Sequence, residues 1–146
     1  KNMKETLISL KTAILAKEKG CTLQSKKAFA EVLQHTIFDT RKGTDIHFDY
    51  VPSVLEYSSI IHKENLFDGN PYVLIAYALT QSILKKWLRK KFNIHVEISW
   101  VDTQADIYIY HISTPGNVIR PDGKFYHSYE EALEFGLAEA LKLIES

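Results

Sequence analysis

The strongest constraint in the sequence is a helix start at Ser128. The run Ser128-Tyr129-Glu130-Glu131 has the capping-box pattern, in which the serine hydroxyl accepts a hydrogen bond from the amide of the third helical residue. The glutamates that follow lie at the positive end of the helix dipole, where negative charge is stabilising. The apolar residues behind the cap recur at helical spacing: Ala132, Leu133, Leu137, Ala140, Leu141 and Ile144. The sequence therefore predicts an acidic, amphipathic C-terminal helix with one buried face.

A second amphipathic helix is predicted between Thr80 and Asn93. Its apolar residues follow the i, i+1, i+4, i+5 and i+9 spacing of a core-facing stripe: Ile83, Leu84, Trp87, Leu88 and Phe92. Two half-buried strands follow, because apolar and polar residues alternate from 95 to 100 and isoleucine alternates with tyrosine from 107 to 110. Turn residues at 115–117 and 121–124 then interrupt a third strand. The predicted order from Thr80 to Ser146 is α-β-β-β-α.

The N-terminal part has weaker signals. Ser9 and Gly20 bracket a helix from Leu10 to Lys19. Apolar residues from Ala28 to Ile37 recur at i, i+1, i+4, i+5 and i+8, which we interpret as a second helix. Alternation at 46–51 predicts a strand that ends at Pro52. The residues from 52 to 71 are expected to form a long loop. The apolar run at 72–78 predicts a buried strand.

Length and composition indicate one domain of the α+β class, with a small antiparallel sheet packed against helices. The chain has 146 residues, 45% of them apolar, which is enough for one core. We expect a single domain over 1–146, made of a variable part at 10–79 and the α-β-β-β-α unit at 80–146. The lone cysteine, Cys21, and the lack of a signal-like apolar run favour the bacterial cytoplasm. The longest apolar stretch, 72–79, is too short for a membrane span.

A cationic run lies on the predicted helix at 80–92. It surrounds Trp87 and consists of Lys85, Lys86, Arg89, Lys90 and Lys91. Cations around an exposed aromatic side chain are typical of nucleic-acid contacts. Here, however, Trp87 falls on the apolar stripe, and cations in the last turns of a helix favour its dipole. A solvated basic helix face is therefore the favoured interpretation, and a nucleic-acid or partner contact is the alternative.

The predicted topology is that of double-stranded-RNA-binding domains, which contact phosphates with lysines at the start of the last helix. At that place this chain carries Glu130 and Glu131, which would repel a phosphate backbone. The candidate sheet is also acidic, with Glu97, Asp102 and Asp106. The net charge of the chain is +0. These charges argue against general nucleic-acid binding.

Catalytic and metal-binding patterns are weak. Asp45, His47 and Asp49 would project from one face of a strand, but such side chains diverge, so a solvent-facing strand explains them better. His95 with Glu97 is a weaker case still. The sequence contains no glycine-rich phosphate loop, serine elbow or zinc-type His-Glu-x-x-His motif. We therefore predict no catalytic residues, no cofactor and no metal, and an enzyme, whose site would depend on long-range geometry, is only the third hypothesis.

Three segments, at 7–20, 80–96 and 128–144, resemble a family of small uncharacterised proteins from phages and prophages of gut anaerobic, Bacteroides-type bacteria. The most specific part is the run from Thr80 to Arg89 around Trp87, and the chain departs from the family at Leu79, where proline is usual. The resemblance implies a phage-type accessory protein and supplies no functional residues. We predict a non-catalytic protein-binding module whose partner is a host or phage protein. The alternative is a nucleic-acid-binding protein that uses the basic helix face.

Overall fold

The computed structural model describes the chain apart from residues 1–4, 37–46, 58–71, 103, 120–123 and 146. The chain divides into two compact units, each described by itself below. Unit 1 combines Lys1–Thr22 with Leu79–Ser146, and unit 2 is Leu23–Ala78. Unit 2 is therefore inserted, in sequence, between the first helix and the rest of unit 1.

Unit 1 contains three helices: α1 (Leu10–Glu18), α3 (Gln81–Phe92) and α4 (Tyr129–Lys142). Each begins behind a hydroxyl cap that accepts the amide proton of the residue three positions on. The caps are Ser9, Thr80 and Ser128. Helix α1 is followed by Gly20 at φ +90°, and α3 ends at Asn93 at φ 55°, both in the left-handed region. The three predicted helices of this unit are confirmed.

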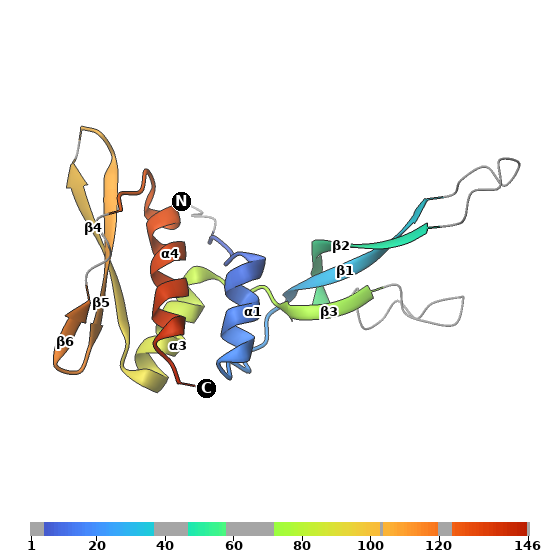
Figure 1. The fold of residues 1–146 in the computed structure, drawn as a ribbon, viewed down its shortest axis with the longest axis horizontal. Coiled ribbons are helices and arrows are strands. Elements are labelled where there is room, and N and C mark those ends of the chain that lie inside the picture. The colour runs from blue at the N-terminus through green and yellow to red at the C-terminus, as the bar shows by residue number, and fades with distance from the viewer. Residues whose placement is uncertain (1–4, 37–46, 58–71, 103, 120–123, 146) are drawn as a thin grey trace, which may run out of the picture. The chain divides into compact units, whose positions relative to one another are not determined.

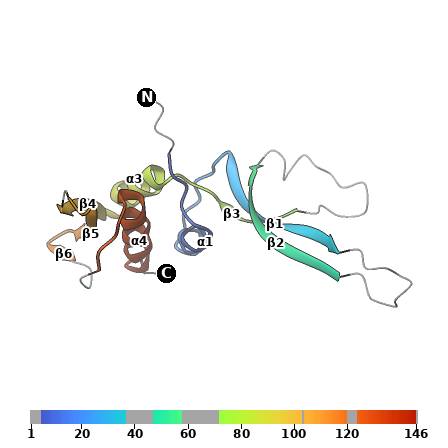
Figure 2. The same ribbon diagram turned by 90° about the horizontal axis from the view of Figure 1, so that it is seen from above.

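Three antiparallel strands complete unit 1: β4 (His95–Asp102), β5 (Ile107–Thr114) and β6 (Asn117–Ile119), in the order β4-β5-β6. The predicted α-β-β-β-α order is confirmed, and so is the α+β class. Helix α4 lies between this sheet and α1, as Figures 1 and 2 show. Helix α4 therefore contacts the sheet as well as both other helices of the unit.

The core of unit 1 lies between the sheet and α4. Strand register pairs Val96 with Ile112 and Ile98 with Tyr110, so these side chains share one face of the sheet. Val96, Tyr110 and Ile112 are buried there. The sequence left open which face of β5 is covered, and the structure buries the face of Tyr110 rather than that of Ile109. The predicted apolar stripe of α4 is buried in full, from Ala132 to Ile144.

The described residues of unit 2 form a three-stranded antiparallel sheet of β1 (Lys27–Thr36), β2 (His47–Glu56) and β3 (Tyr72–Tyr77), in the order β2-β1-β3. The strands predicted near 46–51 and 72–78 are confirmed. The helix predicted from Ala28 to Ile37 is wrong, because residues 27–36 form the central strand and Ile37 lies outside the described residues. Ala28, Phe29 and Ala30 are all buried, so both faces of the strand are covered and no period-2 alternation marks it.

Strand β2 continues through Pro52, where the sequence predicted its end. Pro52 is paired with Glu31 of β1. A proline is tolerated at this place because β2 is an edge strand of the sheet, where an amide can face away from the neighbouring strand. The predicted loop over 52–71 is therefore wrong for residues 52–56, and residues 58–71 lie outside the described part of the chain.

Candidate functional site

The predicted cationic residues lie together on α3. Lys86, Arg89, Lys90 and Lys91 are exposed, and Lys85 is half-buried with its Nζ 4.0 Å from Glu97 Oε2. The predicted stripe of α3 is buried only at Leu84 and Leu88, since Ile83 is exposed and Trp87 and Phe92 are half-buried. The Trp87 ring already has a cation beside it, because Lys91 Nζ lies 5.6 Å from its centroid.

A row of aromatic side chains crosses the sheet on the same face that packs against α4. Trp100 of β4 is the register partner of Tyr108 of β5, and their rings stack at 6.3 Å with an interplanar angle of 9°. Tyr108 in turn forms a reciprocal backbone bridge with Tyr126, with N···O distances of 2.8 and 2.9 Å. Directly opposed residues project to the same face. The three aromatic side chains therefore lie side by side across the sheet.

Phe135 of α4 extends this row. Its ring stacks on that of Tyr126, with centroids 4.9 Å apart, and Tyr126 also contacts Tyr110 at 6.0 Å. We call Trp100, Tyr108, Tyr126 and Phe135 the aromatic face. Tyr126 is only 5% exposed and anchors the group, whereas Trp100 is 55% and Phe135 49% exposed. Helix α4 thus covers the deeper part of the sheet and leaves Trp100 open to solvent.

Carboxylates flank the aromatic face. Asp102 and Asp106 stand at the end of the β4–β5 hairpin, beyond Trp100 and Tyr108, and both are exposed. Glu131 and Glu139 lie four residues to either side of Phe135, which places them on its side of α4, and both are exposed. The exposed aromatic side chains of both elements therefore have acidic neighbours.

The elements that carry the aromatic face include two long stretches without lysine or arginine. Residues 95–114 include three carboxylates and residues 125–141 include four, with no lysine or arginine in either stretch. The nearest cations in sequence are Lys124, which precedes Phe125, and Lys142, which pairs with Glu139 at 2.9 Å. The strands and the helix that carry the aromatic face therefore have more carboxylates than cations, whereas α3 carries five cations and no carboxylate.

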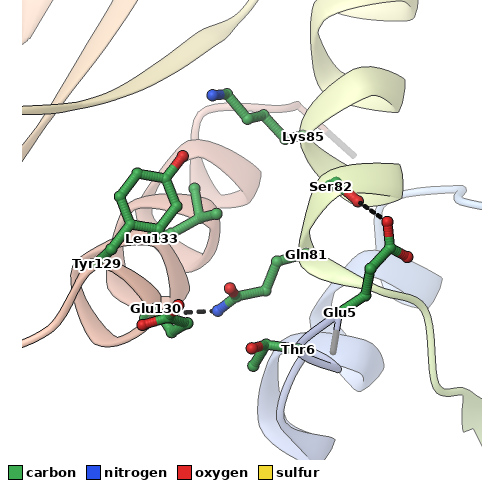
Figure 3. A pocket seen from close by; sticks show the side chains of 8 residues that line it. All are labelled: Glu5, Thr6, Gln81, Ser82, Lys85, Tyr129, Glu130 and Leu133. Atoms are coloured by element: carbon green, nitrogen blue, oxygen red, sulfur yellow. Dashed lines mark hydrogen bonds between the residues drawn. The ribbon is translucent and has the colours of Figure 1, made fainter. Parts of the chain in front are cut away.

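A pocket of about 340 Å³ lies where α3 and α4 begin (Figure 3). It is open to solvent and is lined by Glu5, Thr6, Gln81, Ser82, Lys85, Tyr129, Glu130 and Leu133. Two of the lining side chains donate to other lining residues: Gln81 Nε2 donates to the backbone carbonyl of Glu130 at 2.8 Å, and the Ser82 hydroxyl donates to the Glu5 carboxylate at 3.3 Å. The Ser82 hydroxyl and the Glu5 carboxylate are paired through a long, exposed hydrogen bond, which by itself does not activate a nucleophile, so the pocket supports no specific chemistry.

Glu134 links all three helices of unit 1. Its carboxylate accepts hydrogen bonds from the Ser9 amide at 3.2 Å, the Ser9 hydroxyl at 2.9 Å and the Thr12 hydroxyl. Gln81, which is buried at the start of α3, donates to the same carboxylate at 3.3 Å. This carboxylate is used for helix packing and is not a free acid or base.

The other residues considered from the sequence do not gather into a site. Asp45 and the side chains of His47 and Asp49 lie outside the described structure, so that cluster stays untested. His95 Nε2 lies 2.8 Å from Asn93 Oδ1, and Glu97 lies near Lys85. Within the described residues, no group of three or more His, Cys, Asp or Glu side chains is arranged to hold a metal ion. Cys21 is half-buried.

Local sequence patterns do not predict the aromatic face, although one residue of it gives a signal. Phe135 falls outside the apolar stripe of the last helix, which places it on a different side of that helix from Leu133 and Leu137. An apolar aromatic residue off the buried stripe indicates either a second contact or an exposed surface. The pairing of Trp100 with Tyr108 and Tyr126 depends on strand register, which local patterns do not determine.

Comparison with known proteins identifies no relative of this chain. No family model, no curated protein and no solved structure matches it. In the described residues, no helix is long and apolar enough to cross a membrane.

Proposed function

We propose that the chain is a non-catalytic, phage-type accessory protein that binds another protein through the aromatic face. The observation that supports this proposal is the pair of half-exposed rings, Trp100 stacked on Tyr108 and Phe135 stacked on the buried Tyr126. Tryptophan and tyrosine are enriched in the cores of protein interfaces and among the residues that contribute most binding energy. The half-buried Cys21 fits action in the bacterial cytoplasm.

The position of these rings favours a binding role over a folding role. Tyr126, Tyr110 and Ile112 already complete the core beneath α4, and all three are buried. Truncating Trp100 therefore exposes little of the core, and its ring contributes mainly outward-facing apolar surface. An aromatic surface that is not required for the core and has a polar, charged surround has the composition of a docking site.

Affinity capture with matched variants tests this proposal. The protein is immobilised and exposed to bacterial lysate as wild type, as W100A/F135A, and as the control K86Q/K90Q, which changes only α3. We expect stoichiometric retention of a defined protein by the wild type and the control, and its loss from W100A/F135A. Equal retention by all three variants, or retention of nothing, contradicts the proposal.

The second candidate is a nucleic-acid contact on α3, and the exposure of Lys86, Arg89, Lys90 and Lys91 favours it. Such binding would depend steeply on salt because each phosphate contact releases counterions. It predicts retention of DNA or RNA at low salt that is abolished by K86E/K90E. Absence of a mobility shift at low salt would eliminate this candidate. The carboxylates of Glu130 and Glu131 at the start of α4 argue against it.

A further inference from the structure

We infer that the aromatic face receives a cationic segment of the partner protein, with a lysine or arginine side chain over the Trp100 ring. This inference rests on the proposed function and specifies the chemistry of the partner. Trp100 offers the ring that attracts cations best, and it is 55% exposed. The surrounding carboxylates give the same surface a negative potential.

The charges around the aromatic face come from two elements. Asp102 and Asp106 lie on the hairpin, and Glu131 and Glu139 lie on α4. The part of the hairpin between 95 and 114 and the part of α4 up to Leu141 bring no lysine or arginine to offset them. Glu139 already pairs with Lys142. A neutral apolar segment would bury the other three carboxylates without compensation, whereas a cationic segment pairs with them. Charge complementarity therefore favours a cationic partner.

The protein already shows the proposed contact elsewhere in the same unit. On α3, Lys91 Nζ lies 5.6 Å from the centroid of Trp87 and 5.8 Å from that of Phe92. The α3 sequence supplies that cation one helical turn after the tryptophan. The β4 sequence supplies none near Trp100, whose stacked neighbour is Tyr108. A partner cation would place at Trp100 the interaction that Lys91 makes at Trp87.

Fluorescence anisotropy of short labelled peptides tests the inference on the intact protein. The probes are an Arg-Gly repeat and the same repeat with citrulline, which keeps the planar side chain and removes its charge. We expect the arginine peptide to bind, its affinity to fall as salt rises, and the citrulline peptide to bind about tenfold or more weakly. W100A should weaken arginine-peptide binding by about tenfold, because a desolvated cation–π contact is lost.

Two further variants separate the aromatic contribution from charge and from folding. D102N/E131Q/E139Q removes three charges while the asparagine oxygen still accepts the Gln104 and Ala105 amides that Asp102 accepts now. It should weaken the arginine peptide and leave the citrulline peptide unchanged. K86Q/K90Q on α3 should leave both affinities unchanged. Circular dichroism of each variant verifies that the fold is retained.

The outcomes distinguish this inference from the function on which it rests. Equal affinity for the arginine and citrulline peptides, or arginine binding that W100A leaves unchanged, overturns the cationic partner. If the peptides do not bind but lysate capture still depends on Trp100 and Phe135, the inference falls and the proposed function stands. If neither peptide binding nor capture depends on the aromatic face, both are wrong.

Discussion

Gly136 lies where α4 comes closest to the sheet. A methyl group at this position would lie 2.8 Å from Val96 Cγ1 and 3.1 Å from Tyr110 Cβ. Alanine favours a helix over glycine by about 1 kcal/mol, whereas overpacking a close contact costs about 1 to 3 kcal/mol. The missing side chain thus allows α4 to pack directly on the sheet that carries the aromatic face.

The substitution G136A should therefore lower the free energy of unfolding by about 1 kcal/mol, despite the better helix propensity of alanine. Urea denaturation of wild type and variant measures this difference. V96A removes the nearest methyl group, so the double variant V96A/G136A should be more stable than the sum of the two single effects implies. An increase in stability on G136A alone would show that the helix can move away from the sheet.

Tyr57 and Tyr77 form a ring pair in unit 2, with centroids 5.2 Å apart. The side-chain hydrogen bond with Tyr57, followed by burial, raises the pKa of the Tyr77 hydroxyl above its ordinary value. The folded state therefore holds its proton more tightly than the unfolded chain does. The stabilisation is complete below the unfolded pKa of about 10 and is lost as pH rises through the folded pKa.

Y57F should lower the pKa of Tyr77 toward the ordinary tyrosine value, because it removes the hydroxyl that forms the hydrogen bond. NMR titration of ring-labelled tyrosine follows the Tyr77 resonance directly in both proteins. Y129F, at an exposed tyrosine of α4, is the control and should leave Tyr77 unchanged. A Tyr77 titration curve that is the same in Y57F and wild type contradicts this account.

At the scale of elements, Glu134 determines how the helices of unit 1 assemble. One carboxylate oxygen accepts from the Ser9 amide, the Ser9 hydroxyl and the Thr12 hydroxyl, and the other accepts from Gln81. A glutamine at this position has only one acceptor oxygen. Its amide group is a donor and would face the groups that now donate to the second carboxylate oxygen. Hydrogen bonds to charged groups contribute about 1.5 to 3 kcal/mol, and orphaned donors add cost.

E134Q should therefore destabilise unit 1 by about 2 kcal/mol, and α1 should detach before the other helices. Denaturant unfolding measures the loss, and hydrogen exchange shows whether the amides of α1 lose protection first. E139Q is the matched control, because Glu139 is exposed and its pair with Lys142 is of the kind that contributes at most about 1 kcal/mol. Equal effects of the two substitutions would show that Glu134 has no special role.

The elements predicted correctly are those with local signals. Caps at Ser9, Thr80 and Ser128 and the periodicity behind Ser128 depend on neighbours within a few residues, so the sequence alone reveals them. The strand at 27–36 was mistaken for a helix because its conformation depends on pairing with β2 and β3. The cationic residues of α3 were placed correctly, whereas the aromatic face depends on cross-strand register and was not predicted.

At the scale of the whole chain, unit 1 is discontinuous in sequence. Ile8 donates its amide to the Leu79 carbonyl at 2.9 Å, and Leu7 is bridged to Thr80, which ties the N-terminal segment to the start of α3. The single domain expected over 1–146 stays a prediction. Because the chain divides into two compact units, this prediction can be tested by removing one unit from the protein.

Replacing residues 23–78 with a flexible linker should leave unit 1 folded. The linker must return along the length of α1, about 14 Å at a rise of 1.5 Å per residue, and about eight Gly and Ser residues span it with slack. Cooperative thermal unfolding and retained helical circular dichroism are the expected results. An unfolded product would show that unit 1 requires unit 2, as a single domain would.

The most direct test of the protein-binding account is site-specific photo-crosslinking in bacterial cells. A photoreactive phenylalanine derivative is placed at Trp100 in one variant and at Lys90, on α3, in another. We predict a crosslink to a distinct protein from position 100 and none from position 90. Crosslinks to nucleic acid from position 90, or no crosslink to protein from position 100, would contradict the assignment of the aromatic face as a protein-binding site.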